Sequence, residues 1–124
     1  MRFTLYLTVV LGMFLCEQLT ADPANQRLNP SRSRKLFEQG IEHYNAGRYY
    51  SALDIFRRLK NHPPDQSPQL TASILMCMKS YAMVGRYDEA KDTAREFFEK
   101  FSDSSYLPDV HITLGDVYVS EGYH

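Results

Sequence analysis

Few side chains of this sequence could carry out chemistry, and their spacing does not bring them together. Catalysis would be predicted by a nucleophile with its base, by paired carboxylates in an enclosed site, or by clustered metal ligands. The four histidines are His43, His62, His111 and His124. No two of them are four residues apart, the spacing that puts two metal ligands on one face of a helix. Acidic pairs such as Glu38 and Glu42 are ordinary on a solvated helix. The sequence therefore predicts no enzyme, no cofactor and no metal site.

The two cysteines lie in different contexts, and Cys16 ends an apolar run that follows Met1-Arg2. One cation, a short apolar run and a small residue before a polar turn are typical of a secretory signal peptide. We predict a signal peptide at 1–21, cleaved after Ala21, and a linker at 22–28. The run is shorter than the ~20 residues of a membrane-spanning helix. Two alternatives stay open: an uncleaved anchor, and lipid attachment at Cys16 despite the unusual Leu15 before it.

Export would place the protein in the periplasm or elsewhere in a cell envelope, with Cys77 as the only thiol and no internal disulfide. Cys77 lies in an apolar helical stretch, 74–78, where a small buried packing role is expected. The charges are balanced, with 14 Lys and Arg against 15 Asp and Glu and a net charge of −1. A balance of this kind does not favour nucleic-acid binding.

The strongest pattern in the chain is an internal repeat. Gly-Arg-Tyr occurs at 47–49 and again at 85–87, each time before a similar apolar segment, and Gly122 begins the phrase a third time. The spacings, 38 and 37 residues, are typical of helical-hairpin arrays. A binding scaffold is the first function that such an array suggests.

Local signals within each repeat predict an all-α fold of tandem antiparallel helix hairpins, an α-solenoid of about two and a half repeats. Asn29-Pro30 and Ser67-Pro68 are capped helix starts, and Gly47 and Gly85 are helix ends. The predicted helices cover about 30–46, 49–60, 68–84 and 87–101, and a fifth reaches about Ser120. The repeat domain, 29–124, divides into units at 29–66, 67–103 and an incomplete 104–124.

These positions resemble tetratricopeptide repeats. The first unit matches the family pattern at Leu36, Gly40, Gly47, Tyr49, Ala52, Phe56, Leu59 and Pro64, with His43 where Tyr is usual. The second unit has Met78 in place of the glycine and Ala94 in place of the aromatic residue, and Leu114-Gly115, Tyr118 and Gly122 open the third. The resemblance implies that small residues let neighbouring helices approach closely while aromatic residues fill the remaining space. The residues expected to do so are Gly40, Ala52, Phe56, Ala90 and Gly115.

The units are longer than the usual repeat because of the linkers at 61–67 and 101–106. Stretched repeats of this kind are similar to those of bacterial outer-membrane assembly factors, cell-division coordinators and some periplasmic binding-protein-like chains. The resemblance implies a protein-interaction scaffold in the cell envelope. The alternative is the N-terminal repeat segment of a longer periplasmic protein, whose ligand-binding or catalytic part is missing here.

The resemblance also implies a partner-binding groove, lined by the first helix of each unit. By this register the groove residues are Arg34, Phe37, Ile41, Tyr44, Asn45, Lys79, Met83, Ile112 and Asp116, together with Ala82 and Val119. A protein or peptide partner would suit this apolar floor with polar flanks. Phe37 and Ile41 replace the Lys and Asn that grip a terminal carboxylate in some members, which disfavours that mode. Packing of Phe37 and Ile41 under residues 22–28 is the alternative.

The predicted fifth helix carries apolar residues on more than one side, with Ile112 and Val119 lying off the face that meets the array. Terminal repeats usually present a polar outer surface. We therefore expect either self-association through residues 107–120 or a truncated reading frame.

Overall fold

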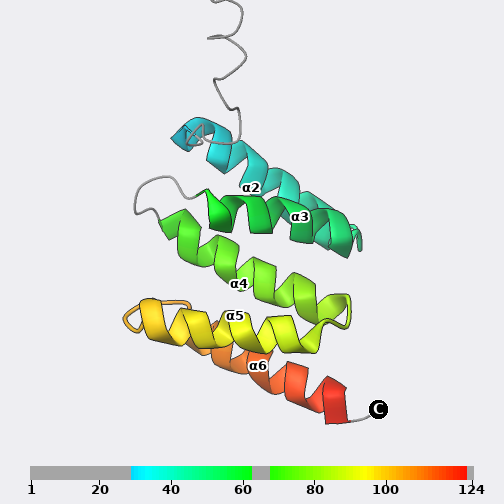
Figure 1. The fold of residues 1–124 in the computed structure, drawn as a ribbon. Helices are drawn as coiled ribbons and strands as arrows, with labels where there is room; N and C mark the ends of the chain where they lie inside the picture. The colour runs from blue at the N-terminus through cyan, green and yellow to red at the C-terminus, as the bar shows by residue number, and fades with distance from the viewer. Residues whose placement is uncertain (1–28, 63–67, 123–124) are drawn as a thin grey trace, which may run out of the picture.

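The computed structural model describes residues 29–62 and 68–122, which form five α-helices. In chain order these are α2 (Pro30–Asn45), α3 (Tyr49–Asn61), α4 (Pro68–Met83), α5 (Tyr87–Lys100) and α6 (Leu107–Gly122). Each helix packs against the next, and successive helices run in opposite directions (Figure 1). This arrangement confirms the predicted all-α array of helical hairpins, and the predicted helix ends match closely.

The predicted signal peptide, its cleavage site at Ala21 and the linker at 22–28 lie outside the described residues, as does the Ser67 cap. Among the helices that the structure describes, none is both long and apolar enough to cross a membrane.

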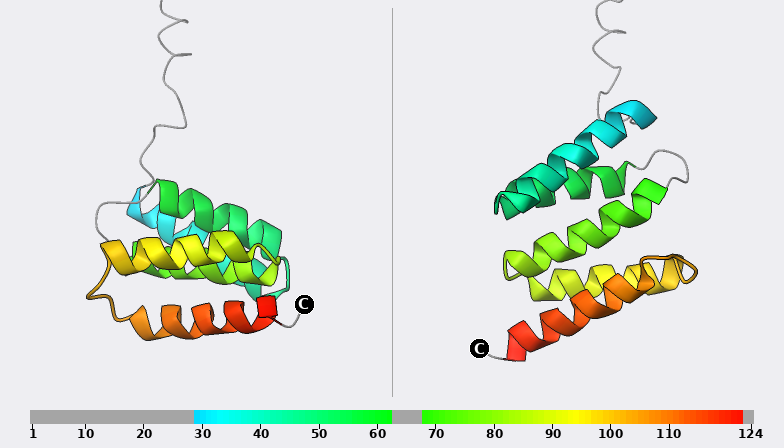
Figure 2. Two further views of the ribbon diagram at one scale, coloured as in Figure 1. Left: turned by 60° about the horizontal axis from the view of Figure 1, so that its bottom comes forward. Right: turned by 180° about the vertical axis from the view of Figure 1, so that it is seen from behind.

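The helices form two layers. α2, α4 and α6 lie side by side on one face, with α3 and α5 behind them (Figure 2, right). α4 contacts α2 on one side and α6 on the other. The first helices of the three units therefore share one surface, and the second helices of the first two units cover the opposite surface.

The repeated Gly-Arg-Tyr phrase forms the same turn twice. Gly47 has a φ of 76°, which an L side chain rarely adopts, and Arg48 N and Gly47 N donate to the carbonyl oxygens of His43 and Tyr44 at 2.9 and 3.0 Å. One repeat later, with a φ of 78° at Gly85, the same two bonds join Arg86 to Tyr81 and Gly85 to Ala82. Both turns are Schellman motifs, which satisfy carbonyls at the end of a helix. The two hairpins therefore share the same hydrogen-bond pattern at the turn into their second helix.

The helix starts use local caps. Asn29 Oδ1 accepts a hydrogen bond from Arg32 N at 3.0 Å, and Pro30 occupies the first position of α2, as predicted. Before α6, Ser104 Oγ accepts from Tyr106 N at 3.2 Å. These side chains satisfy amides that have no partner within their helix.

The core is built from two adjoining clusters. One lies between α3 and α4 and contains Ala52, Leu53, Phe56, Leu59 and Cys77. The other joins α4, α5 and α6 through Ile74, Leu75, Met78, Ala90, Ala94, Phe97, Val110 and Val117. Tyr81 packs against both clusters, so the apolar interior continues from one unit into the next. This continuity is typical of a solenoid, in which each repeat buries its apolar face on its neighbours.

Four of the five residues assigned to repeat packing lie in this interior. Ala52, Phe56 and Ala90 are buried completely. A Cβ atom on Gly40 would lie 2.7 Å from Phe56 Cε1, so only glycine allows the ring to approach α2 this closely. Gly115 differs from the prediction, because it is exposed and a Cβ there would meet no atom within 4 Å. No described helix covers that side of α6, so Gly115 mediates no close approach.

Candidate functional site

The shared face of α2, α4 and α6 contains a hollow of about 260 Å³. All three helices contribute to it, and its lining consists of Tyr44, Lys79, Ala82, Met83, Asp109, Ile112, Thr113, Asp116 and Ser120. Met83 is 50 % exposed and Ile112 is 65 % exposed, so two large apolar side chains on different helices are open to solvent there. We call this hollow the groove.

Five of the nine residues assigned to the groove from the sequence line it. They are Tyr44, Lys79, Met83, Ile112 and Asp116. Ala82 also lines the groove, whereas Val119 is exposed on α6 but is not part of the lining.

The remaining four residues lie on α2 away from the groove lining. Phe37 and Ile41 are half-buried and pack against the core cluster of α3, with the Phe37 and Phe56 rings in an edge-on contact at 5.7 Å. Arg34 is exposed and pairs with Glu38 at 3.3 Å, and Asn45 is exposed at the end of α2. Phe37 and Ile41 therefore serve mainly to hold α2 on α3.

Three groove residues were not assigned from the sequence: Asp109, Thr113 and Ser120. They are spaced at three or four residues from Ile112 and Asp116, so helical periodicity places all five on one side of α6. This spacing was the signal that could have identified them. Thr113 is mostly buried, and its hydroxyl donates a hydrogen bond to the backbone carbonyl of Asp109 at 2.8 Å. Thr113 therefore does not bond the side-chain carboxylate of Asp109.

The groove carries one cation and two anions. Neither Lys79, Asp109 nor Asp116 forms an ion pair with another residue in the described part of the chain. Burial raises the pKa of the Tyr44 hydroxyl, and the nearby Tyr49 adds to the effect, so Tyr44 stays neutral. The groove thus offers an apolar floor, a neutral hydroxyl and charges of both signs.

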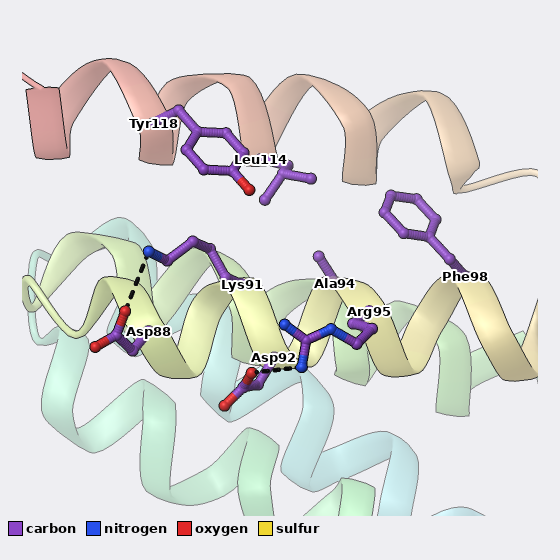
Figure 3. Close-up of a pocket in the computed structure, with 8 residues that line it drawn as sticks. All are labelled: Asp88, Lys91, Asp92, Ala94, Arg95, Phe98, Leu114 and Tyr118. Atoms are coloured by element: carbon purple, nitrogen blue, oxygen red, sulfur yellow. Dashed lines mark hydrogen bonds and ion pairs between the residues drawn. The ribbon is translucent and has the colours of Figure 1, made fainter.

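A second hollow of about 580 Å³ lies between α5 and α6. Figure 3 shows Leu114 and Tyr118 pointing from α6 toward α5, with Ala94 and Phe98 opposite them. Its polar edge consists of paired side chains, Lys91 with Asp88 and Arg95 with Asp92, each at 3.1 Å (Figure 3). We call this surface the α5–α6 face.

Among the described residues, the cysteine and histidine side chains, which could act as a nucleophile, a base or a metal ligand, do not line either hollow. Cys77 is buried in the core, where desolvation raises the pKa of its thiol to about 11, so the reactive thiolate is scarce at neutral pH. This environment suits the packing role expected from the sequence. Within residues 29–62 and 68–122, no group of three or more His, Cys, Asp or Glu side chains is arranged to hold a metal ion.

Comparison with protein-family models, with curated proteins and with solved structures found no match to this chain.

Proposed function

We propose that the protein is a scaffold of the tetratricopeptide kind, which binds a segment of a partner protein in the groove of α2, α4 and α6. The observation that carries the proposal is the convergence of Tyr44, Lys79, Met83, Ile112 and Asp116, from three helices, on one hollow. Residues up to 72 positions apart in sequence meet there only because the three first helices share a layer.

The chemistry of the groove indicates the kind of segment that fits. The exposed Met83 and Ile112 side chains would bury an apolar side chain of the partner, which is favourable in proportion to the apolar area removed from water. Lys79 would attract an acidic residue, and Asp109 and Asp116 would attract a basic one. An amphipathic helix or an extended peptide with mixed charge meets these requirements.

Photocrosslinking tests the groove directly. A photoreactive phenylalanine analogue is placed at Met83 or at Ile112, and in a matched control at Tyr50 on α3, which is 68 % exposed. Both groove positions should give the same crosslinked product, and the Tyr50 position should give none. Replacing Lys79 by Glu should weaken that product without changing the helical content. Crosslinks of equal strength at Tyr50, or different products from the two groove positions, would contradict the proposal.

We further propose that the scaffold works in a bacterial cell envelope, as an adaptor in an assembly or cell-wall process. The apolar N-terminal segment and the long inter-repeat linkers support this location. Mass spectrometry of the mature N-terminus tests it, with Asp22 as the expected first residue. An acylated Cys16 would instead support membrane anchoring of the same scaffold, and an intact Met1 would argue against export with cleavage.

A further inference from the structure

The two walls of the groove carry charges of opposite sign. Lys79 lies on the α4 wall and is the only charged residue of that helix. Asp109 and Asp116 lie on the α6 wall, and α6 contains no lysine or arginine. The exposed side chains of Met83 and Ile112 line the same hollow. The groove is therefore a partly apolar hollow with a basic side and an acidic side.

The charges on the two walls do not neutralise each other. Within the described residues, Lys79 forms no ion pair with Asp109 or Asp116, although all three line one hollow. The remaining acidic residue of α6, Glu121, pairs with Lys91 of α5 at 3.0 Å and so is directed away from the groove. A carboxylate is stabilised in the first turn of a helix, which accounts in part for Asp109, but Asp116 lies in the middle of α6. Lys79 and Asp116 therefore keep their charges available to a bound segment.

The cations at the two turns that follow α2 and α4 have partners of their own. Arg48 donates from Nε to Nδ1 of His43 at 2.8 Å. Arg86 pairs with Glu89 at 2.7 Å and lies over the ring of Tyr81. Among the described residues, Lys79 is thus the one lysine or arginine that lines the groove.

The repeat places Lys79 and Asp116 on facing walls. They are 37 residues apart, the spacing from the second repeat to the third, so they occupy equivalent positions on two helices that lie side by side (Figure 2, right). Asp109 lies two helical turns before Asp116, which is about 10 Å along the axis of α6. Ile112 lies between the two carboxylates on the same side of the helix. The acidic wall thus repeats at the spacing of helical turns.

This arrangement suits a helix better than an extended segment. An amphipathic helix presents an apolar stripe with a polar flank on each side, and each flank repeats every three to four residues. An extended segment directs alternate side chains to opposite faces, so only one row of them would enter the hollow. A helix can bury its stripe against Met83 and Ile112 while its two flanks meet Lys79 and the α6 carboxylates.

We propose that the groove binds one amphipathic helix of a partner protein whose two flanks carry opposite charges, and that these charges fix the direction in which the helix lies. Its acidic flank lies beside Lys79, and its basic flank lies beside Asp109 and Asp116. This inference rests on the function proposed above and specifies the partner of the same site. Turning such a helix end to end would exchange its flanks and bring like charges together on both walls. Charged flanks set the orientation of paired helices in coiled coils in the same way.

Model peptides of known charge test the direction. Two peptides of about 18 residues, long enough to form a helix, carry the same leucine stripe. One has lysines on one flank and glutamates on the other, and in the second the two flanks are exchanged. A third peptide has glutamines on both flanks. Each carries a nitroxide at its N-terminus and is added at millimolar concentration to the intact, isotope-labelled protein.

The nitroxide should broaden different NMR signals for the two charged peptides. One peptide should broaden the signals around Asp109 and the other those around Ser120, which lie about 16 Å apart along α6. The favoured direction should exceed the other about tenfold, because several solvated charge pairs add together. The glutamine peptide should bind in both directions and broaden the signals at both ends.

Exchanging the charges of the two walls gives the sharper test. In the variant Lys79→Glu, Asp109→Lys, Asp116→Lys, each charged peptide should lie in the reverse direction. The variant Lys79→Gln, Asp109→Asn, Asp116→Asn changes the side chains less, and it should remove the preference for one direction. Circular dichroism checks that both variants keep their helical content.

The matched control is Asp54→Lys on α3, in the opposite layer. Asp54 is exposed and forms no ion pair within the described part of the chain. This variant makes the same change of charge away from the groove, so both peptides should keep their directions.

Several results would overturn the inference, and they separate it from the groove function. Charged peptides that shift the groove signals without a preferred direction would leave the groove in place but remove the role of the flanks, as would an unchanged direction after the wall exchange. No shift of the groove signals with any of the three peptides would contradict the groove function as well. If Lys79→Glu and Asp116→Lys each lower the melting temperature and together restore it, the two side chains pair with each other in the free protein and the inference fails.

Discussion

The first and second repeats fill the same interface with opposite combinations of side chains. In the first, Gly40 on α2 faces Phe56 on α3, and the ring lies where a Cβ would need to be. In the second, the equivalent residues are Met78 on α4 and Ala94 on α5, both buried. One repeat places the large side chain on its second helix, and the other places it on its first.

The difference shows that the interface constrains the combined volume of the pair rather than the identity of either residue. Protein interiors are close-packed, so a large side chain on one helix requires a small one opposite. The resemblance to tetratricopeptide repeats treats Met78 and Ala94 as two separate departures from the pattern. In the structure both are buried in the same core cluster, as expected if the large residue on α4 compensates for the small one on α5.

Loss of the large member of a pair should have the largest effect. Replacing Phe56 by Ala should lower the free energy of unfolding by about 3–5 kcal/mol, because it leaves a cavity beside Gly40 that the backbone cannot fill. Urea denaturation followed by circular dichroism measures this loss. A loss below about 1 kcal/mol would mean that Phe56 is not the contact that fixes α3 on α2.

Transplanting the second repeat's arrangement into the first should show the compensation. Gly40→Met alone should cost about 1–3 kcal/mol by overpacking against Phe56. The double variant Gly40→Met, Phe56→Ala should be more stable than the two single losses added together, with a coupling of at least ~1 kcal/mol. The coupling energy is obtained from the unfolding free energies of the unmodified protein, the two single variants and the double variant, measured under the same conditions. Strictly additive losses would refute the compensation between positions 40 and 56.

The two helical glycines at equivalent positions should respond to alanine in opposite directions. Gly115→Ala should stabilise the protein by about 0.5–1 kcal/mol, because alanine favours a helix and nothing lies within 4 Å. Gly40→Ala gains the same helix preference but places its Cβ against Phe56, so a net destabilisation is expected. The melting temperatures of both variants, compared with that of the unmodified protein, test this prediction. A change of melting temperature in the same direction for both would show that the two glycines are not packed differently.

The ion pair between repeats should contribute least. Lys60 on α3 pairs with Glu96 on α5, which also accepts a hydrogen bond from Lys100 at 3.1 Å. Burial raises the pKa of Glu96, but the bonds from Lys60 and Lys100 outweigh it and hold the pKa below 4.5. Glu96→Gln should cost about 0.2–1 kcal/mol at pH 7, since both side chains are partly solvated.

The acid dependence of that cost has a defined sign. A carboxylate with a lowered pKa stabilises the folded state above its unfolded pKa, and the contribution disappears as pH falls through the folded value. The difference between the protein and Glu96→Gln should therefore be full at neutral pH, shrink as the pH falls below the ordinary pKa of a glutamate, and disappear once Glu96 is protonated in the folded protein as well. A difference that grows in acid would show that the lysines are not the partners of Glu96.

Much of the candidate groove could be predicted from the family resemblance combined with helical register. The resemblance to tetratricopeptide repeats indicated that the first helix of each unit faces the groove, and counting along those helices then gave Lys79, Met83, Ile112 and Asp116, which line it. Phe37 and Ile41 were assigned in the same way but pack against the core cluster of α3, because periodicity alone does not tell which side of an apolar helix face the neighbouring helix covers. Asp109 and Ser120 were overlooked because a polar residue near a helix end is common on any solvated surface.

The sequence by itself determined the helices, their breaks and their order. These features depend on local forces: the Asn29 cap, the positive φ that Gly47 and Gly85 accept, and apolar residues three and four positions apart. Such forces act within about one turn of the chain, so they can be recognised without knowing the neighbours.

Only the tertiary structure decided which surfaces are covered. Gly40 and Gly115 are the same residue at equivalent places in a repeat, yet one is closed by an aromatic ring and the other is open. Their difference depends on whether another helix lies across them, and that is settled by packing between segments far apart in sequence. For the same physical reason, the groove and the α5–α6 face exist only once the five helices are stacked.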